Sequence, residues 1–295
     1  MIHFLLPDKN TIKLLRIPFS LFLMPVFLLA LSQVHSVNLN TAIWSFLIIH
    51  LLIYPSSNGY NSYIDKDESS IGGLEKPPMP TIKLFYLTLV MDALAIVLAF
   101  FMVSILFALC LILFIMVSRA YSSKLIRLKK YPIIGLLVVV VFQGAFTYYI
   151  SYIGISGSTW LFNQNDTFIL LACSLQIAGA YPLTQIYQHR EDLANGDITI
   201  SARLGYTGTF LFSLIMFVLC AYCYYLYFEG FKSINHFLIL QIFFLPVIIY
   251  FLIWFMKVIK DQTKANYKNT MRMNLIASVC MSACFMTFTL IKYLK

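Results

Sequence analysis

Hydrophobic residues along the chain fall into nine long runs separated by short polar connections. A helix needs about 20 apolar residues to cross a bilayer, and each run is close to that length. The runs lie at 16–36, 40–60, 82–101, 102–119, 132–154, 167–188, 207–228, 235–257 and 273–293. The pattern predicts an all-α polytopic membrane protein with nine transmembrane helices and a single domain over residues 1–295.

Composition and charge agree with this prediction. The chain is 60% hydrophobic and 11% charged, and its mean hydropathy is +0.82. Lys and Arg gather in every second connection, and such loops stay on the cytoplasmic side, so we expect a cytoplasmic N-terminus and an uncleaved first span. Topology alone accounts for the net charge of +9, and no nucleic-acid partner is expected. The compact size and cysteine-poor loops suit a bacterial inner membrane.

Acidic residues are concentrated in two short stretches, after the second and the sixth run, and the stretches repeat each other at a fixed offset. The matched pairs are Tyr54-Pro55 and Tyr181-Pro182, Asn58 and Gln185, Tyr60 and Tyr187, Asn61 and Gln188, and Asp65 and Asp192. Amide, amide and carboxylate recur at i, i+3 and i+7, which places them on one stripe of a helix.

This repeat predicts two related halves, 1–131 and 132–295, each with four helices, and a ninth helix added to the second. Parallel repeats in membrane proteins commonly place a site at the interface of the halves, so we expect a central polar cavity. The alternative is that Tyr-Pro recurs by chance and the polar residues mark where helices leave the bilayer.

Two acid-amide stripes suit a metal-bridged diphosphate, because Mg²⁺ prefers oxygen ligands and often binds through carboxylates and substrate phosphates. Cations near the stripes could hold phosphate oxygens, although inside-positive topology also explains them. The 26 Phe and 19 Tyr residues could line an apolar tunnel. The expected ligand therefore has a diphosphate head and a long hydrocarbon tail.

The two stretches resemble the signatures of the UbiA-type intramembrane prenyltransferases. The first signature of that family is Asn-x-x-x-Asp followed by Arg-Pro, which Asn61, Asp65 and Lys76-Pro77 resemble. The second ends in Gly-x-x-Thr-x-x-x-Arg-Leu-Gly, which residues 196–205 match. One departure is that Gln replaces the usual Asp at positions 185 and 188.

The resemblance implies Mg²⁺-dependent transfer of an isoprenyl group from a polyprenyl diphosphate to a hydrophobic or aromatic acceptor within the membrane. The residues expected to be catalytic are Asp65 and Asp192. The expected metal ligands are Asn61, Asp65, Glu68, Gln188 and Asp192. The residues expected to bind diphosphate are Lys76, Lys124, Arg127, Lys129 and Arg16. The residues expected to line the cavity are Asn58, Tyr60, Gln185, Tyr187, His189 and Asp92.

Glu68 is included because the family's further acid is missing after Asp65. On a straight helix Glu68 would lie closer to the Asp65 face than Asp67 does. Asp92 is included because an acid within a membrane span is costly and marks a functional site by default. It could handle protons on the acceptor side or be a hydrogen-bonded packing residue.

An alternative function is a UbiA-like protein that has lost catalysis and binds or transports a lipid or prenyl ligand. The neutral residues Gln185 and Gln188 motivate it, as does Asp92, which could serve a proton-coupled carrier.

Overall fold

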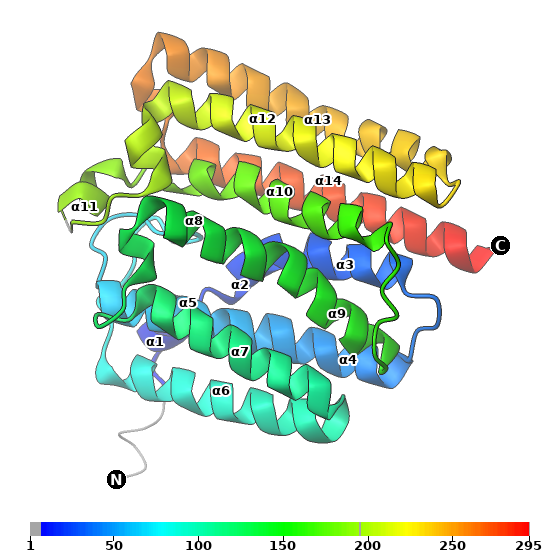
Figure 1. The fold of residues 1–295 in the computed structure, drawn as a ribbon. Helices are drawn as coiled ribbons and strands as arrows, with labels where there is room; N and C mark the ends of the chain where they lie inside the picture. The colour runs from blue at the N-terminus through cyan, green and yellow to red at the C-terminus, as the bar shows by residue number, and fades with distance from the viewer. Residues whose placement is uncertain (1–6, 195, 295) are drawn as a thin grey trace. The chain divides into compact units, whose positions relative to one another are not determined.

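The structure is a computed structural model that describes residues 7–194 and 196–294 (Figure 1). Within this part of the chain, nine helical segments are long and apolar enough to cross a membrane, and the predicted number of spans is confirmed. They are Lys9–Gln33, Leu39–Asp65, Ile82–Met102, Ile105–Ser122, Pro132–Ser156, Asp166–Gln185, Ile200–Gly230, Ile234–Lys260 and Tyr267–Leu294. Among the described residues, one isolated bridge, Ile71 with Leu74, is the only β-type pairing.

The chain divides into two compact units. Unit 1 takes in the residues up to Leu21, His35–Lys129 and Ile153–Thr159. Its main helices are α4 (Leu39–Leu47), α5 (Tyr54–Asp65), α6 (Ile82–Met102) and α7 (Ile105–Ser122). The short α1 (Lys9–Leu14) and α2 (Ile17–Ser20) pack against α5.

Unit 2 comprises Phe22–Val34, Lys130–Tyr152 and Trp160–Lys295. Its helices are α3 (Met24–Gln33), α8 (Pro132–Val140), α10 (Asp166–Gln185), α11 (His189–Ala194), α12 (Ile200–Gly230), α13 (Ile234–Lys260) and α14 (Tyr267–Leu294), with α9 (Thr147–Ser156) crossing its boundary. Helix α3 belongs to the predicted first half but packs against α14. The units therefore do not follow the boundary between residues 131 and 132.

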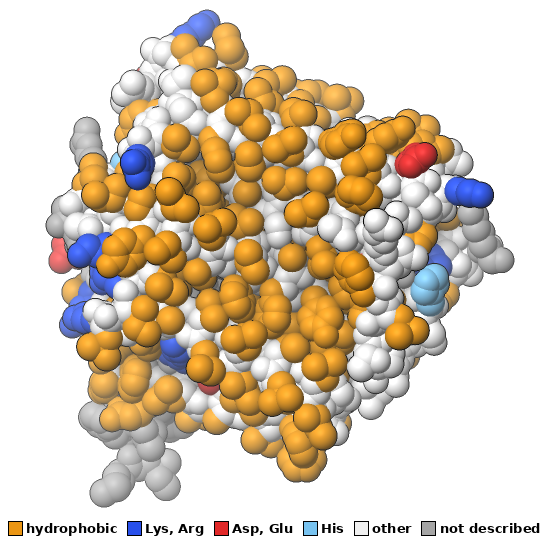
Figure 2. Space-filling view, viewed as in Figure 1, with side chains coloured by type: hydrophobic (Ala, Val, Ile, Leu, Met, Phe, Trp, Pro, Cys, Tyr) orange, Lys and Arg blue, Asp and Glu red, His pale blue; other side chains and the backbone are white. Residues whose placement is uncertain are grey.

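Hydrophobic side chains cover most of the visible face of both units (Figure 2). The spans keep large apolar residues at their surface, such as Val90 at 62% and Phe101 at 74% exposure. Such exposure is unfavourable in water but not against lipid, where it satisfies the apolar surroundings. The chain is an integral membrane protein.

The second span changes its helical pitch just before the first polar stretch. A π-helical turn occupies Ile48–Ile53, and Pro55 lies in the first turn of α5. Proline has no N–H to donate, and its ring clashes with the carbonyl four residues earlier. The wider turn accommodates the ring, and turns of this kind often lie near functional sites.

Helix α5 ends at Asp65, because Lys66 adopts the left-handed conformation with φ 54°. Its N–H donates to the carbonyl of Ser62 at 3.1 Å, which closes the last turn. The prediction that favoured Glu68 over Asp67 assumed a helix continuing past this point, and that assumption is wrong. Both acids lie on the loop that follows.

Gly144 brings the fifth span and α10 into backbone contact. A Cβ atom at this position would lie 2.6 Å from Ser174 Cα and 2.8 Å from Ser174 N. Only a hydrogen side chain allows so close an approach, and small residues are typical where membrane helices meet.

We predict that Gly144→Ala lowers the free energy of unfolding by about 1–3 kcal/mol, because the added methyl group overpacks this contact. Thermal unfolding of the purified protein in detergent measures the change. Gly208→Ala is the matched control, since its new Cβ would meet only the Leu204 Cβ, at 3.2 Å. Equal melting temperatures for both variants would contradict the close packing of α10.

Candidate functional site

The first acid-amide motif lies on one face of α5, and the end of α7 and the loop after it contact this face. Asn61 Nδ2 donates to Asp65 Oδ2 at 2.8 Å and to Ser122 Oγ at 3.0 Å. Lys129 Nζ forms an ion pair with Asp65 Oδ2 at 2.6 Å. The fold of unit 1 thus brings together two predicted metal ligands and one predicted diphosphate-binding residue.

Asp65 keeps one oxygen available in this cluster. Its side chain is 5% exposed, and Oδ1 is buried without a hydrogen-bond partner among the described residues. A buried carboxylate oxygen without a partner is unfavourable unless a cation or donor reaches it. Beside the amide of Asn61, this oxygen fits the ligand preference of Mg²⁺. The described residues contain no group of three or more His, Cys, Asp or Glu side chains that could hold a metal ion.

The remaining cations predicted in unit 1 differ in their surroundings. Arg16 is 8% exposed, and its guanidinium donates to the carbonyls of Gly72 at 3.3 Å and Asn58 at 3.1 Å. Arg16 thereby ties the loop after α5 to α5 itself. Lys76 and Lys124 are exposed on loops.

Two other predicted residues also lie on loops of unit 1. Glu68 is exposed in the loop after α5. Arg127 has a left-handed backbone with φ 46° and is half-buried. Their predicted roles as metal and diphosphate ligands stay predictions.

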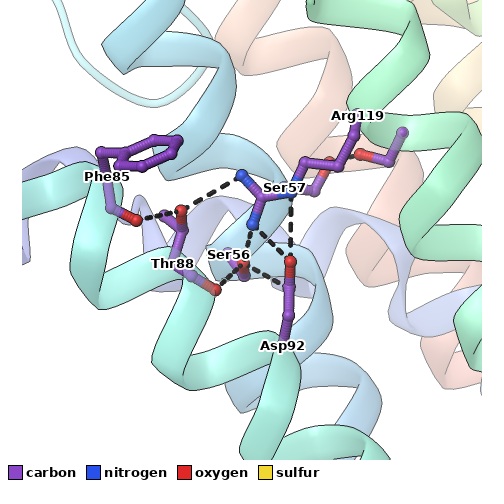
Figure 3. A network of polar contacts seen from close by, with 7 residues as sticks. Ser56, Ser57, Phe85, Thr88, Asp92 and Arg119 are labelled. Carbon is purple, nitrogen blue, oxygen red and sulfur yellow. Dashed lines mark hydrogen bonds and ion pairs between the residues drawn. The ribbon is translucent and has the colours of Figure 1, made fainter.

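Asp92 belongs to a polar network that the hydropathy pattern did not reveal (Figure 3), and the ring of Tyr60 lies beside it. Asp92 is 8% exposed and forms an ion pair with Arg119. Ser56 Oγ donates to the second oxygen of Asp92 at 2.6 Å, and the Arg119 guanidinium lies 4.0 Å from the centroid of the Tyr60 ring. The signal that could have found Arg119 was a cation near the end of the span that follows Asp92.

The second motif is split between α10 and α11. Gln185 ends α10, Gln188 lies in a turn, and Asp192 lies in α11. The Gln188 N–H donates to the carbonyl of Gln185 at 3.0 Å, and this tight turn replaces the helical bond. The prediction that one continuous helix carries all three side chains is therefore wrong for the second half.

Gln185 and Tyr187 lie at the end of this span. Gln185 is 8% exposed, and its Nε2 donates to the Tyr181 hydroxyl at 2.8 Å. Its Oε1 is buried and has no hydrogen-bond partner in the described part of the chain. The ring of Tyr187 meets that of Tyr267 edge to face, with centroids 5.5 Å apart.

The Gly-x-x-Thr-x-x-x-Arg-Leu-Gly signature forms the entry to α12. Gly196 and Gly205 have φ of 74° and 68°, a region that favours glycine. Thr199 is the N-cap, and its hydroxyl accepts from the N–H of Ala202 at 3.3 Å. The helix bends at Gly205. The two glycines and the threonine of the signature thus suit the local backbone.

His189 fastens α11 to the start of α12. Its Nε2 lies 2.8 Å from Ser201 Oγ, and Ser201 is in turn 3.0 Å from the Thr209 hydroxyl. The ring stacks on Tyr206 with centroids 4.9 Å apart. Burial lowers the pKa of His189, because a charged imidazole loses its hydration there.

Comparisons with known proteins identify the family and the fold. A family model described as the UbiA prenyltransferase family matches residues 20–276. The apo structure of a UbiA homologue from Aeropyrum pernix shares the fold with a TM-score of 0.70 and 16% identity over 92% of this chain and 98% of that one. A UbiA homologue from Archaeoglobus fulgidus bound to GPP and Mg²⁺ has a TM-score of 0.66 and 16% sequence identity, over 95% of this chain and 99% of that one.

A structure of digeranylgeranylglyceryl phosphate synthase gives a TM-score of 0.59 and 16% identity over 96% of this chain and 97% of that one. No curated protein matches the sequence. At this identity the likenesses concern the fold, and they confirm the predicted all-α architecture.

We predict that the protein loses stability at acid pH partly through His189. An unfolded histidine titrates near pH 6.5, whereas the lowered pKa keeps the buried ring neutral further into acid. The stabilising effect of the neutral ring is complete above about pH 6.5 and declines as the pH falls toward the lowered value. His189→Gln should therefore weaken the pH dependence of the melting temperature below about pH 6.5.

The exposed His35 supplies the control, and His35→Gln should keep the wild-type pH profile. The same acid dependence in His189→Gln as in wild type would refute this role of the buried ring.

Proposed function

Because the chain belongs to the UbiA prenyltransferase family, we propose that it transfers an isoprenyl group from a polyprenyl diphosphate to a hydrophobic or aromatic acceptor within the membrane. The family supports prenyl transfer in general. UbiA homologues from Archaeoglobus fulgidus bound to GPP and Mg²⁺ and to DMAPP and Mg²⁺ support a prenyl diphosphate as the donor. The excess of Lys and Arg in alternate connections supports a cytoplasmic N-terminus. The compact size and cysteine-poor loops support a bacterial inner membrane.

The observation that carries the proposal is the Asn61, Asp65 and Lys129 cluster. It combines a buried carboxylate, an amide and an ammonium group within direct contact. These are the groups needed to hold a divalent cation and an anionic diphosphate side by side.

In unit 1, Asn61 and Asp65 would bind Mg²⁺, with Glu68 as a further acid. The second motif would offer Gln188 and Asp192 as metal ligands of its own. Bound Mg²⁺ would neutralise negative charge on the departing diphosphate. Ser122 accepts one N–H of Asn61, which keeps the amide oriented beside Asp65. The chain thus prepares the position of its ligands before any substrate binds.

Lys129 would have two successive partners. Without substrate it neutralises Asp65, which a buried carboxylate requires. With the metal site filled, the Lys129 ammonium would turn to the diphosphate oxygens and donate charge-assisted hydrogen bonds to them. Lys129 would then stabilise negative charge on the leaving group together with Lys76, Lys124 and Arg127.

The apolar spans would exclude water from the allylic carbon while the bond to diphosphate breaks. A carbocation-like centre reacts readily with water, so a dry chamber protects the transfer. Gln185 contributes a buried carbonyl oxygen without a described partner, which favours a role for this residue in binding a ligand or a metal-bound water.

A second candidate is a protein of this family that binds or transports a prenyl ligand without transferring it. Gln185 and Gln188 favour it, because two neutral residues stand where the family usually has Asp. The ion pair of Asp92 with Arg119 weakens the case for a proton-coupled carrier, since the acid already has a cation. Binding of prenyl diphosphate without product, together with uptake driven by a proton gradient in proteoliposomes, would favour this candidate.

We predict that purified protein with Mg²⁺ and geranyl diphosphate forms prenylated product from a membrane lipid extract. Asp65→Asn and Asp192→Asn should each lower the rate about 100-fold or more, since each removes a carboxylate ligand of the Mg²⁺ that would stabilise the leaving diphosphate. Mass spectrometry of products and released diphosphate measures the effect. Asp261→Asn, on an exposed turn beside Thr263, is the control and should keep the rate. Wild-type rates in both site variants would end the site assignment.

We also predict opposite effects of Lys129→Met on the two ligands. Mg²⁺ alone should bind more tightly, because the competing ammonium is gone. Geranyl diphosphate in the presence of Mg²⁺ should bind about tenfold more weakly, because a charge-assisted hydrogen bond is lost. Titration calorimetry measures both affinities, and Lys130→Met at the exposed neighbouring position is the control. If both ligands weakened together, the exchange of partners by Lys129 would be refuted.

A further inference from the structure

The Asp92–Arg119 ion pair has no part in the chemistry proposed above, yet it joins three helices inside unit 1. Arg119, on α7, donates from Nε to Asp92 Oδ2 on α6 at 3.1 Å, and its Nη2 contacts the same oxygen. Nη1 donates to Thr88 Oγ1 at 3.2 Å, and Nη2 donates to Ser56 Oγ on α5 at 3.2 Å (Figure 3). Each nitrogen of the guanidinium therefore has an acceptor.

Both carboxylate oxygens of Asp92 also have hydrogen-bond donors. Its Oδ1 accepts from Ser56 at 2.6 Å and its Oδ2 accepts from Arg119. Ser56 lies nine residues before Asp65, which is about 14 Å along a helix at 1.5 Å per residue. Asp92 therefore does not reach the diphosphate motif, and any effect on the chemistry must pass through α7 or α5.

The contacts of α7 with α5 continue from this pair to the proposed metal ligands. Ser118 Oγ and Ser57 Oγ lie 2.6 Å apart, and Arg119 lies over the Tyr60 ring. One turn further along α7, Ser122 accepts the N–H of Asn61. Polar contacts thus follow the two helices on successive turns.

We infer that Asp92 and Arg119 are positioning residues that hold α7 in the register at which Ser122 orients Asn61 beside Asp65. This inference rests on the proposed function for the role of Asn61 and Asp65. A slide or rotation of α7 would separate the pair and leave two charges unpaired in apolar surroundings, which is strongly unfavourable. The ion pair therefore admits one register where apolar contacts alone would tolerate several.

The test measures metal affinity separately from stability. The readout is the Mg²⁺ concentration that gives half of the thermal stabilisation in the presence of geranyl diphosphate. Asp92→Asn removes the charge but keeps an acceptor for Ser56, and Thr88→Val removes one acceptor of Arg119 while leaving the ion pair intact. We expect Asp92→Asn to raise the half-saturating Mg²⁺ about three- to tenfold, the range for misplacing one hydrogen bond. Thr88→Val should raise it less.

Two comparisons separate positioning from a purely structural role. Ser45→Ala removes another buried hydrogen bond of unit 1, to the carbonyl of Thr41 at 2.6 Å, and should lower the melting temperature without changing the half-saturating Mg²⁺. The single substitution Ser122→Ala should raise the half-saturating Mg²⁺ concentration. Combined with Asp92→Asn it should add little, because residues that act through one contact are non-additive.

Several results would overturn the inference. One is an unchanged half-saturating Mg²⁺ in Asp92→Asn or, if that variant does not fold, in Thr88→Val. Another is full additivity of Asp92→Asn with Ser122→Ala. Loss of prenyl transfer in Asp92→Asn with unchanged Mg²⁺ and diphosphate binding would instead place Asp92 on the acceptor side. A wild-type protein that Mg²⁺ and geranyl diphosphate do not stabilise would overturn the proposed function, and this inference with it.

Discussion

A carboxylate in apolar surroundings must have a cation close to it, and the polar architecture of unit 1 depends on this constraint. The cost of an unpaired buried charge is several kcal/mol in proteins, which exceeds what most single packing contacts contribute. Asp92 meets the requirement with Arg119 and Asp65 meets it with Lys129. Both cations come from the end of α7 or the segment after it, so charge pairing joins this end of α7 to α5 and α6.

The two acids differ in what remains after pairing. Both oxygens of Asp92 accept hydrogen bonds from within the fold, so its contacts are complete, as the inferred role in holding helices requires. Asp65 keeps one buried oxygen without a described partner, and its cation is a lysine, whose flexible ammonium can move to another anion more easily than the fork of an arginine. The same requirement for charge pairing thus produces one contact that is complete within the fold and one that we propose is exchanged when substrate binds.

The second motif depends on neutral amides and backbone conformation more than on charge pairing. Where unit 1 uses charges, the end of α10 uses the neutral amides Gln185 and Gln188, whose oxygens can still bind a ligand at lower electrostatic strength. Its geometry comes from backbone features: a tight turn after Gln185, the N-cap Thr199 and the bend at Gly205. Similar signatures in the two halves therefore arise from unlike local structures, a continuous helix in one and a helix, turn and helix in the other.

The sequence by itself determined the nine spans, the membrane environment and the family, because apolar run length and short motifs are properties of consecutive residues. It also identified Asp65 and Asp92 as acids that need a function. Only the tertiary structure decided their partners, since Arg119 is 27 positions from Asp92, and neither hydropathy nor spacing selects Lys129 over Lys124. The physical reason is that a charge pairs with whichever cation the packed helices bring within reach, and that choice depends on the positions of whole helices.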